Sequence, residues 1–169
     1  MNTKIVTLLN EQINKEFFSA YLYLSFANYL EEKGLVGFAH WYEIQTQEER
    51  DHALLMVQFL QNNDGKLVYE AIKKPENHWE NVLEVLKAGL AHEKYITASI
   101  NDIYSVALDE KEYRITQFLD WFVKEQAEEE TSVNNIIKKV EMIGDGGNGI
   151  YMLDKELALR VYTAPSLVL

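Results

Sequence analysis

The sequence carries one glutamate near the middle of each of four long apolar patterns. Each glutamate interrupts apolar residues that recur at helical spacing, and the four are Glu16, Glu49, Glu93 and Glu129. A single glutamate in such a run is usually a boundary residue, but several buried carboxylates together are costly unless they are protonated or neutralised. No Lys or Arg interrupts the runs at the same height. A bound cation is the simplest way to neutralise these carboxylates, so the pattern predicts a buried metal site.

Two pairs of polar residues add further candidate ligands. Glu49 and His52 occupy positions i and i+3, which lie on one face of a helix. Gln126 and Glu129 repeat this spacing in the fourth pattern. Oxygen ligands with one imidazole suit iron or manganese, and also zinc, and disfavour copper(I) and iron–sulfur clusters. Glu49 is well placed to bridge two metals, and two adjacent irons could each give one electron to oxygen.

Four residues close to these candidate ligands have two interpretations. Glu48, Glu125 and Glu128 each lie one position from a candidate ligand. They are either a solvated acidic flank, which is the more common outcome, or a third and weaker cation site. Tyr23 lies two turns from Glu16 on the same face. It either packs in the core or serves the site, as a hydrogen-bond donor to a ligand or as an electron donor during oxygen reduction.

Turn-forming residues divide the chain into five predicted helices. Short links near residues 33–35 and 108–109 predict antiparallel neighbours. Residues 64–78 can extend over about 50 Å, enough to run along a helix of about 43 Å, so the second and third helices should be parallel. We expect an all-α single domain over residues 1–169. It comprises a four-helix bundle over about 2–143, with one long crossover, and a short helix over about 150–162. The bundle helices are expected at about 2–32, 36–63, 79–107 and 110–143.

Composition excludes several classes of function. The net charge of −11 argues against nonspecific binding to nucleic acid or to an anionic membrane. The chain has no cysteine, which excludes disulfides, thiolate metal sites and iron–sulfur clusters. No apolar stretch has the length of a secretory signal core or of a membrane span. We therefore expect a soluble cytoplasmic protein without nucleic-acid or membrane partners.

Several motifs around these residues resemble those of the non-haem ferritins of bacteria and archaea. The similarity covers about residues 5–161 and implies a ferritin-like fold. It also implies self-association into a shell of 24 subunits, which oxidises Fe(II) with dioxygen or hydrogen peroxide and stores ferric mineral inside. The motifs are NKEFFSAYLY at 14–23, QEERDH at 47–52, AHEK at 91–94, WFVKEQAEEE at 121–130 and LDKEL at 153–157.

The resemblance also implies roles for individual residues of a di-iron ferroxidase centre. Glu16, Glu49 and His52 would bind one iron, and Glu49, Glu93 and Glu129 would bind the other. Gln126 would form a hydrogen bond near the oxygen-binding position. A third iron site in bacterial members matches three acidic residues here, which are Glu48, Glu125 and Glu128.

The sequence departs from that of bacterioferritins in two respects, and two alternative functions are considered beside iron storage with ferroxidase activity. Bacterioferritins carry Glu and His where this chain has Gln126 and Glu129, and their haem-binding Met matches Arg50, so no haem is expected. The main alternative is a di-iron oxidase, or a peroxidase of the rubrerythrin class, without iron storage. The absence of cysteine removes the usual form of rubrerythrin. A non-catalytic shell subunit is a further alternative, against which the full ligand set argues.

Overall fold

The computed structural model describes residues 2–144 and 147–169, and all regular structure within them is helical. α1 starts where the Asn2 side chain accepts a hydrogen bond of 2.9 Å from the backbone N–H of Lys4. It ends before Gly34, whose φ of 75° is available to glycine at little cost. The five helices are α1 (Thr3–Glu32), α2 (Val36–Asn62), α3 (Val82–Asp109), α4 (Tyr113–Ile143) and α5 (Gly147–Leu157).

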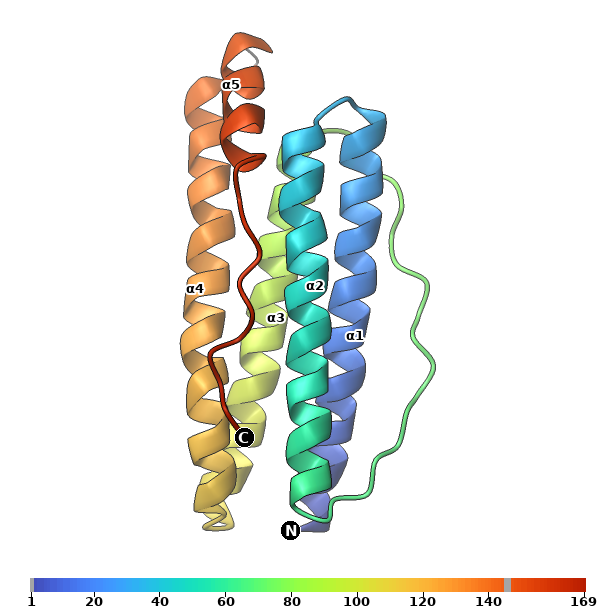
Figure 1. The fold of residues 1–169 in the computed structure, drawn as a ribbon, viewed down its shortest axis with the longest axis vertical. Helices are drawn as coiled ribbons and strands as arrows, with labels where there is room; N and C mark the ends of the chain where they lie inside the picture. Colours follow the sequence, from blue (N-terminus) through green and yellow to red (C-terminus); the bar gives the residue numbers. More distant parts are fainter. Residues whose placement is uncertain (1, 145–146) are drawn as a thin grey trace.

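Two helical hairpins form a four-helix bundle with one long crossover, which confirms the predicted topology (Figure 1). α1 packs against α2 and α3, and α3 packs against α4. The crossover between α2 and α3 runs along the outside of α1 and is held there by side chains of that helix. Asn10 accepts a hydrogen bond of 2.7 Å from the N–H of Val68, and Ser25 donates one of 2.7 Å to the carbonyl of Glu76. The crossover therefore reaches the far end of the bundle, so that α2 and α3 run parallel.

Two apolar clusters fill the bundle, one toward each end. One cluster contains Tyr23, Phe26 and Leu86, and the other contains Ile13 and Phe122, each with neighbours from the same helices. Along every helix of the bundle the central glutamate lies between a residue of one cluster and a residue of the other. The polar residues thus form a layer between two apolar regions, as the spacing predicts.

Several boundaries and two buried positions correct the expectations from sequence. α3 begins at Val82 rather than near residue 79, because the Asn81 side chain accepts a hydrogen bond from the N–H of Glu84 and caps the helix there. α4 begins at Tyr113 rather than near residue 110. The apolar spacing of the sequence also places Ala20 and Val82 on the buried faces of their helices, but both are only partly buried, and Ser19 is buried instead of Ala20.

The last helix is also shifted, to Gly147–Leu157 from the expected 150–162. Part of the glycine-rich break therefore belongs to the helix, and residues 145–146 of that break lie outside the described part of the chain. α5 packs against α2 and α4. Its buried Asp154 accepts hydrogen bonds from the N–H groups of Gly37, at 2.8 Å, and Phe38, at 3.0 Å. This carboxylate caps α2, which has no side-chain cap of its own, and so fixes the position of α5.

After α5 the chain turns back and runs between α2 and α4 toward the other end of the bundle (Figure 1). Tyr162 donates a hydrogen bond to the Asp51 carboxylate of α2, and Trp121 of α4 donates one of 3.0 Å to the Ser166 hydroxyl. These contacts hold the segment after Leu157 against α2 and α4. Among the described helices, none is long and apolar enough to cross a membrane.

Candidate metal centre

Each helix of the bundle contributes one central carboxylate to a compact polar layer. Glu16 projects from α1, Glu49 from α2, Glu93 from α3 and Glu129 from α4, and each is between 1% and 5% exposed. His52, one helical turn after Glu49, is 1% exposed. The layer therefore removes four carboxylates and an imidazole from water, which is unfavourable unless they share a proton or a cation.

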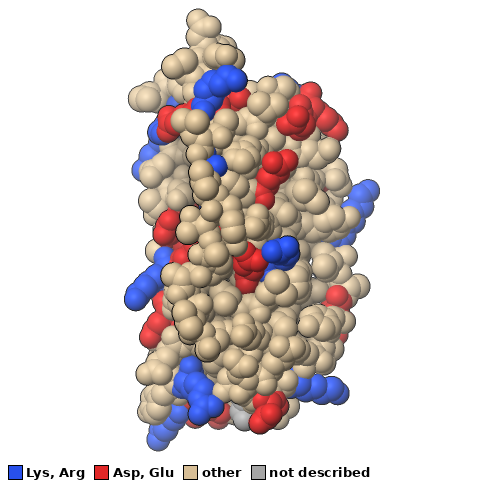
Figure 2. All heavy atoms as spheres, viewed as in Figure 1, with Lys and Arg blue, Asp and Glu red and all other residues tan. Residues whose placement is uncertain are grey.

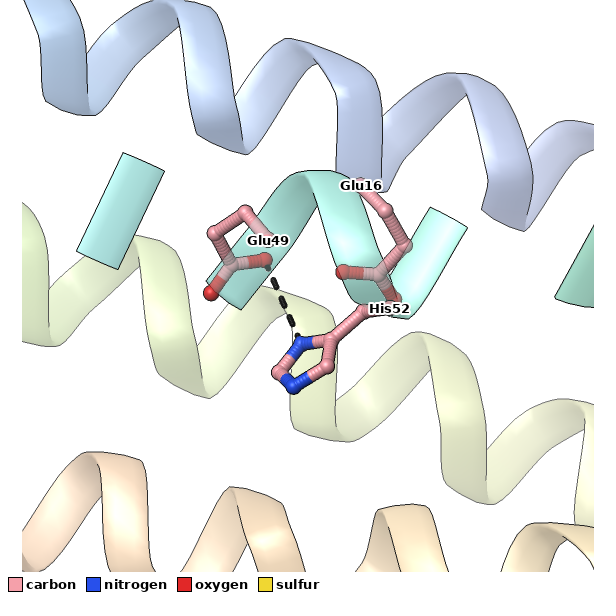
Figure 3. Close-up of side chains that lie close together, drawn as sticks. All are labelled: Glu16, Glu49 and His52. Carbon is pink, nitrogen blue, oxygen red and sulfur yellow. Dashed lines mark ion pairs between the residues drawn. The ribbon is translucent and has the colours of Figure 1, made fainter. Parts of the chain in front are cut away.

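The ligand atoms of these residues form two overlapping groups. Glu16, Glu49 and His52 each offer one atom within 4.8 Å of the others, and so do Glu49, Glu93 and Glu129. In Figure 3 the Glu16 and Glu49 carboxylates and the His52 imidazole converge from α1 and α2. Nδ1 of His52 lies 3.7 Å from Oε2 of Glu49. Because Glu49 belongs to both groups, its carboxylate is placed to bridge two adjacent cations.

Neutral donors orient three of the carboxylates. Gln12 donates a hydrogen bond of 2.7 Å to Oε1 of Glu16, and Gln45 donates one of 2.6 Å to Oε2 of Glu129. Glu93 accepts hydrogen bonds from two donors, which are the Tyr23 hydroxyl and, at 3.0 Å, Nε2 of Gln126. Each carboxylate is thus held by an uncharged group and keeps its charge available for a cation.

Burial strongly favours the protonated form of Glu49, Glu93 and Glu129. It raises the pKa of Glu93 to about 7, although hydrogen bonds from Tyr23 and Gln126 oppose the rise. It raises the pKa of Glu129 to about 8, with a further contribution from the Glu93 charge. The pKa of Glu49 rises well above its ordinary value, through burial and then through the neighbouring carboxylates. Such shifts mark a site in which a cation would replace protons.

Several buried polar atoms lack a hydrogen-bond partner among the described residues and are suited to bind a metal ion instead. These atoms include Oε2 of Glu16, Oε1 of Glu49 and Nδ1 of His52. Their residues together make up the first ligand group. Buried acceptors without donors are destabilising, and a divalent cation satisfies them together. The set of oxygens with one imidazole suits iron, as expected from the sequence.

Comparison with known proteins identifies the family. The sequence model of the ferritin-like domain matches residues 6–143. A bacterial non-heme ferritin of Campylobacter jejuni is 37% identical over 155 residues, covering 92% of this chain and 93% of that protein. One from Staphylococcus epidermidis is 33% identical over 96% of this chain and 98% of that protein. The chain belongs to the ferritin family.

Solved ferritin structures share the whole architecture. A humanized archaeal ferritin is 41% identical with a TM-score of 0.95, over 96% of this chain and 99% of that one. An Archaeoglobus fulgidus ferritin engineered into a closed form is 39% identical with a TM-score of 0.95, at the same coverage. The resemblance to non-haem ferritins is confirmed. Membership supports iron storage with ferroxidase activity, and it disfavours a di-iron oxidase or peroxidase without storage.

Glu48, Glu125 and Glu128, the acidic flank of this ferritin, share a pocket but do not form a group of three whose ligand atoms lie within 4.8 Å of one another. They line one pocket of 310 Å³, together with His52 and residues of the C-terminal segment. The group with ligand atoms close enough to share a cation is instead His52, Glu125 and Glu129. Glu128 is exposed, and Glu48 is engaged by Arg160 at 2.7 Å. A third cation site at these acids stays a prediction.

Reasoning from the sequence missed three residues that contact the candidate ligands. Gln12 and Gln45 lie one turn before Glu16 and Glu49, and a buried amide at that spacing was the available signal. Arg160 lies in a segment expected to be helical, and no local pattern connects it with Glu48. The redox role considered for Tyr23 also stays a prediction, although its hydroxyl does contact Glu93.

Proposed function

We propose that this ferritin oxidises Fe(II) at the paired ligand groups and stores the ferric product inside a shell of 24 subunits. The observation that carries the proposal is the sharing of Glu49 by two groups of ligand atoms at the centre of the bundle. One group would bind one iron through Glu16, Glu49 and His52. The other would bind the second iron through Glu49, Glu93 and Glu129. Iron is here both the substrate and the stored material.

The residues around the irons account for the direction of the reaction. Carboxylates are hard anionic donors and stabilise Fe(III) over Fe(II). Two Fe(II), one dioxygen and two protons give two Fe(III) and one hydrogen peroxide, so a pair of irons supplies both electrons. With hydrogen peroxide as the oxidant, two Fe(II) and two protons give two Fe(III) and two waters. In both cases Glu93 and Glu129, which are protonated in part near neutral pH, can release protons as iron binds.

Storage requires an enclosed volume that a single chain does not supply. Large apolar residues exposed on α1, the crossover and α5 support self-association, because such residues usually mark protein contacts when they gather on a surface. Examples are Tyr21 and Leu24 on α1, Tyr69 on the crossover, and Tyr151 and Met152 on α5, which are between 49% and 67% exposed. We expect the assembled shell in the cytoplasm.

The test of this proposal is aerobic iron loading. Fe(II) is added to the chain in large excess, and the soluble product is separated by gel filtration with iron and protein detected together. We expect iron well beyond the few ions that a site can ligate to elute with a shell-sized particle. Glu49→Ala should slow the loading, whereas Glu43→Ala should not, since the Glu43 side chain on the same helix is 61% exposed.

Two outcomes of the iron-loading experiment would contradict the proposal. If only about two irons per chain remain with a small oligomer and the rest precipitates, storage fails and the di-iron oxidase or peroxidase becomes the better account. If Glu43→Ala slows loading as much as Glu49→Ala does, the oxidation does not depend on the buried groups. In that case the assignment of the ligands is wrong even if iron is stored.

A further inference from the structure

The C-terminal segment of residues 158–169 covers the acidic pocket beside His52. It passes between α2 and α4 (Figure 1) and contributes Arg160, Val161 and residues 163–166 to the pocket wall. Figure 2 shows that this face is mostly uncharged, with acidic and basic side chains next to one another near its middle. The C-terminal segment therefore forms part of the wall around any cation held in this pocket.

Arg160 anchors the segment at the pocket through several contacts. Its Nη2 donates a hydrogen bond of 2.7 Å to Oε2 of Glu48, and its Nη1 donates one of 3.2 Å to the carbonyl of Trp41. The guanidinium lies 4.7 Å from the centre of the Trp41 ring. The backbone carbonyl of Arg160 lies 2.9 Å from Nε2 of His40, within hydrogen-bond distance. Both the side chain and the backbone of Arg160 are thus held by α2.

The positive charge of the Arg160 guanidinium lies beside Glu48, at a position that would otherwise attract a metal cation. Three carboxylates line the pocket, and among its lining residues in the described part of the chain Arg160 is the only Lys or Arg. The ion pair is partly shielded, since the side chain of Glu48 is 16% exposed and that of Arg160 is 25% exposed. A metal ion that uses Glu48 must compete with the guanidinium for the charge of this carboxylate, of which Arg160 contacts Oε2.

We propose that Arg160 is a built-in competitor for the third cation position, and that a divalent cation bound there releases the C-terminal segment from the bundle. The inference rests on the proposed function, because it gives the acidic pocket a cation to hold. Arg160 acts through Glu48 and is a positioning residue. Cation binding and segment release are linked, so if a bound cation favours the released segment by a given factor, the released state binds the cation more tightly by the same factor.

Zn²⁺ is the probe for this coupling, since it binds oxygen and imidazole ligands and undergoes no oxidation. Calorimetric titration of the metal-free assembly with Zn²⁺ measures the affinity of the weakest zinc site. Hydrogen exchange measures the mobility of residues 158–166. We expect Arg160→Gln to strengthen the weakest site by about five- to tenfold, given a partly buried ion pair. Saturating Zn²⁺ should speed exchange in the segment of the wild-type chain and have little further effect in Arg160→Gln.

Two further variants separate the ion pair from general effects of substitution. Arg160→Lys keeps the charge but loses the planar contact with Trp41 and should fall between wild type and Arg160→Gln. Lys139→Gln removes an exposed cation that pairs with Glu156 and should change neither readout. Unchanged zinc affinity in Arg160→Gln, or exchange in the segment that does not respond to Zn²⁺ in the wild type, overturns the inference.

The zinc experiment is independent of iron storage. A wild-type chain that stores no iron but shows the coupling would overturn the proposed function and leave the role of Arg160 intact. A chain that stores iron, with no coupling between zinc and the segment, would support the proposed function and overturn the role of Arg160.

Discussion

Gln45 of α2 donates a hydrogen bond of 2.6 Å from Nε2 to Oε2 of Glu129 of α4, across the centre of the bundle. Both residues are buried, and Glu129 has a pKa raised to about 8. The Gln45 amide therefore holds the Glu129 carboxylate toward Glu49 and Glu93, the other two members of the second ligand group. It stabilises the ionised form of Glu129 without offering a competing charge.

Gln45→Leu should weaken the second metal position more than the first. Loss of a donor that orients a ligand typically lowers metal affinity by about 10- to 100-fold. Zinc titration of the metal-free assembly should show this loss at the second position and not at the first, because the Gln45 side chain donates to Glu129, which belongs to the second ligand group and not to the group of Glu16, Glu49 and His52. Gln58→Leu, on the exposed side of α2, is the control. Equal affinity in Gln45→Leu and wild type would contradict a positioning role.

Tyr23→Phe should lower apparent metal affinity in a pH-dependent manner. The Tyr23 hydroxyl donates to Glu93 and opposes the rise in its pKa, so removing it makes protons stronger competitors for that carboxyl. We expect a loss of about tenfold near pH 6 and a smaller loss near pH 8, measured by zinc titration. Tyr29→Phe, whose ring packs on Trp79, should bind zinc as the wild type does. A loss of equal size at both pH values would argue for a packing defect.

The metal-free protein should lose stability as the pH rises. Glu93 and Glu129 have folded-state pKa values of about 7 and about 8, above the value of about 4.3 for glutamate in an unfolded chain. The folded state therefore binds more protons. This stabilisation is complete below about pH 4.3 and is lost as the pH rises through the folded-state values. Each excess proton changes the free energy of unfolding by about 1.4 kcal/mol per pH unit.

Thermal unfolding from about pH 5.5 to 8.5, with a chelator or with excess Zn²⁺, measures this effect. The melting temperature should fall with pH in the chelator and change less with Zn²⁺, because the metal replaces the protons. Glu93→Gln with Glu129→Gln should flatten the curve in the chelator. A metal-free protein that becomes more stable across this range would show that other groups dominate.

Asp154→Ala should detach α5 from the start of α2. The carboxylate accepts hydrogen bonds from the N–H groups of Gly37 and Phe38, and its loss leaves both donors unpaired at a cost of about 1–2 kcal/mol. Gly37→Ala should have a similar effect for a steric reason, because a Cβ there would lie 1.7 Å from the carbonyl oxygen of Asp154. Hydrogen exchange of residues 147–157 measures the detachment.

Glu156→Ala is the matched control for that experiment. Glu156 lies on the same helix, and its side chain is 59% exposed in a surface ion pair with Lys139, a kind of pair that contributes little to stability. If Glu156→Ala loosens α5 as much as Asp154→Ala does, the cap is not what holds the helix. If neither variant changes exchange, the other contacts of α5 with α2 and α4 are sufficient to hold it.

The sequence alone determined the helical bundle and the composition of its polar layer. Apolar residues at helical spacing define a buried face for each helix, and a carboxylate at each midpoint must meet the others whichever way the helices run. His52 and Gln126 were found in the same way, since i and i+3 positions share a face. Their roles toward iron stay predictions, but their positions followed from spacing and helix length.

Only the tertiary structure decided which groups orient these carboxylates and what covers them. Asp154 contacts Gly37 and Arg160 contacts Glu48 across more than a hundred residues of sequence, and no local pattern encodes such pairs. The path of the chain after Leu157 also depends on distant contacts, because Tyr162 and Ser166 are hydrogen-bonded to α2 and α4. Periodicity specifies a buried face, whereas hydrogen bonds between distant elements depend on where the folded chain places each side chain.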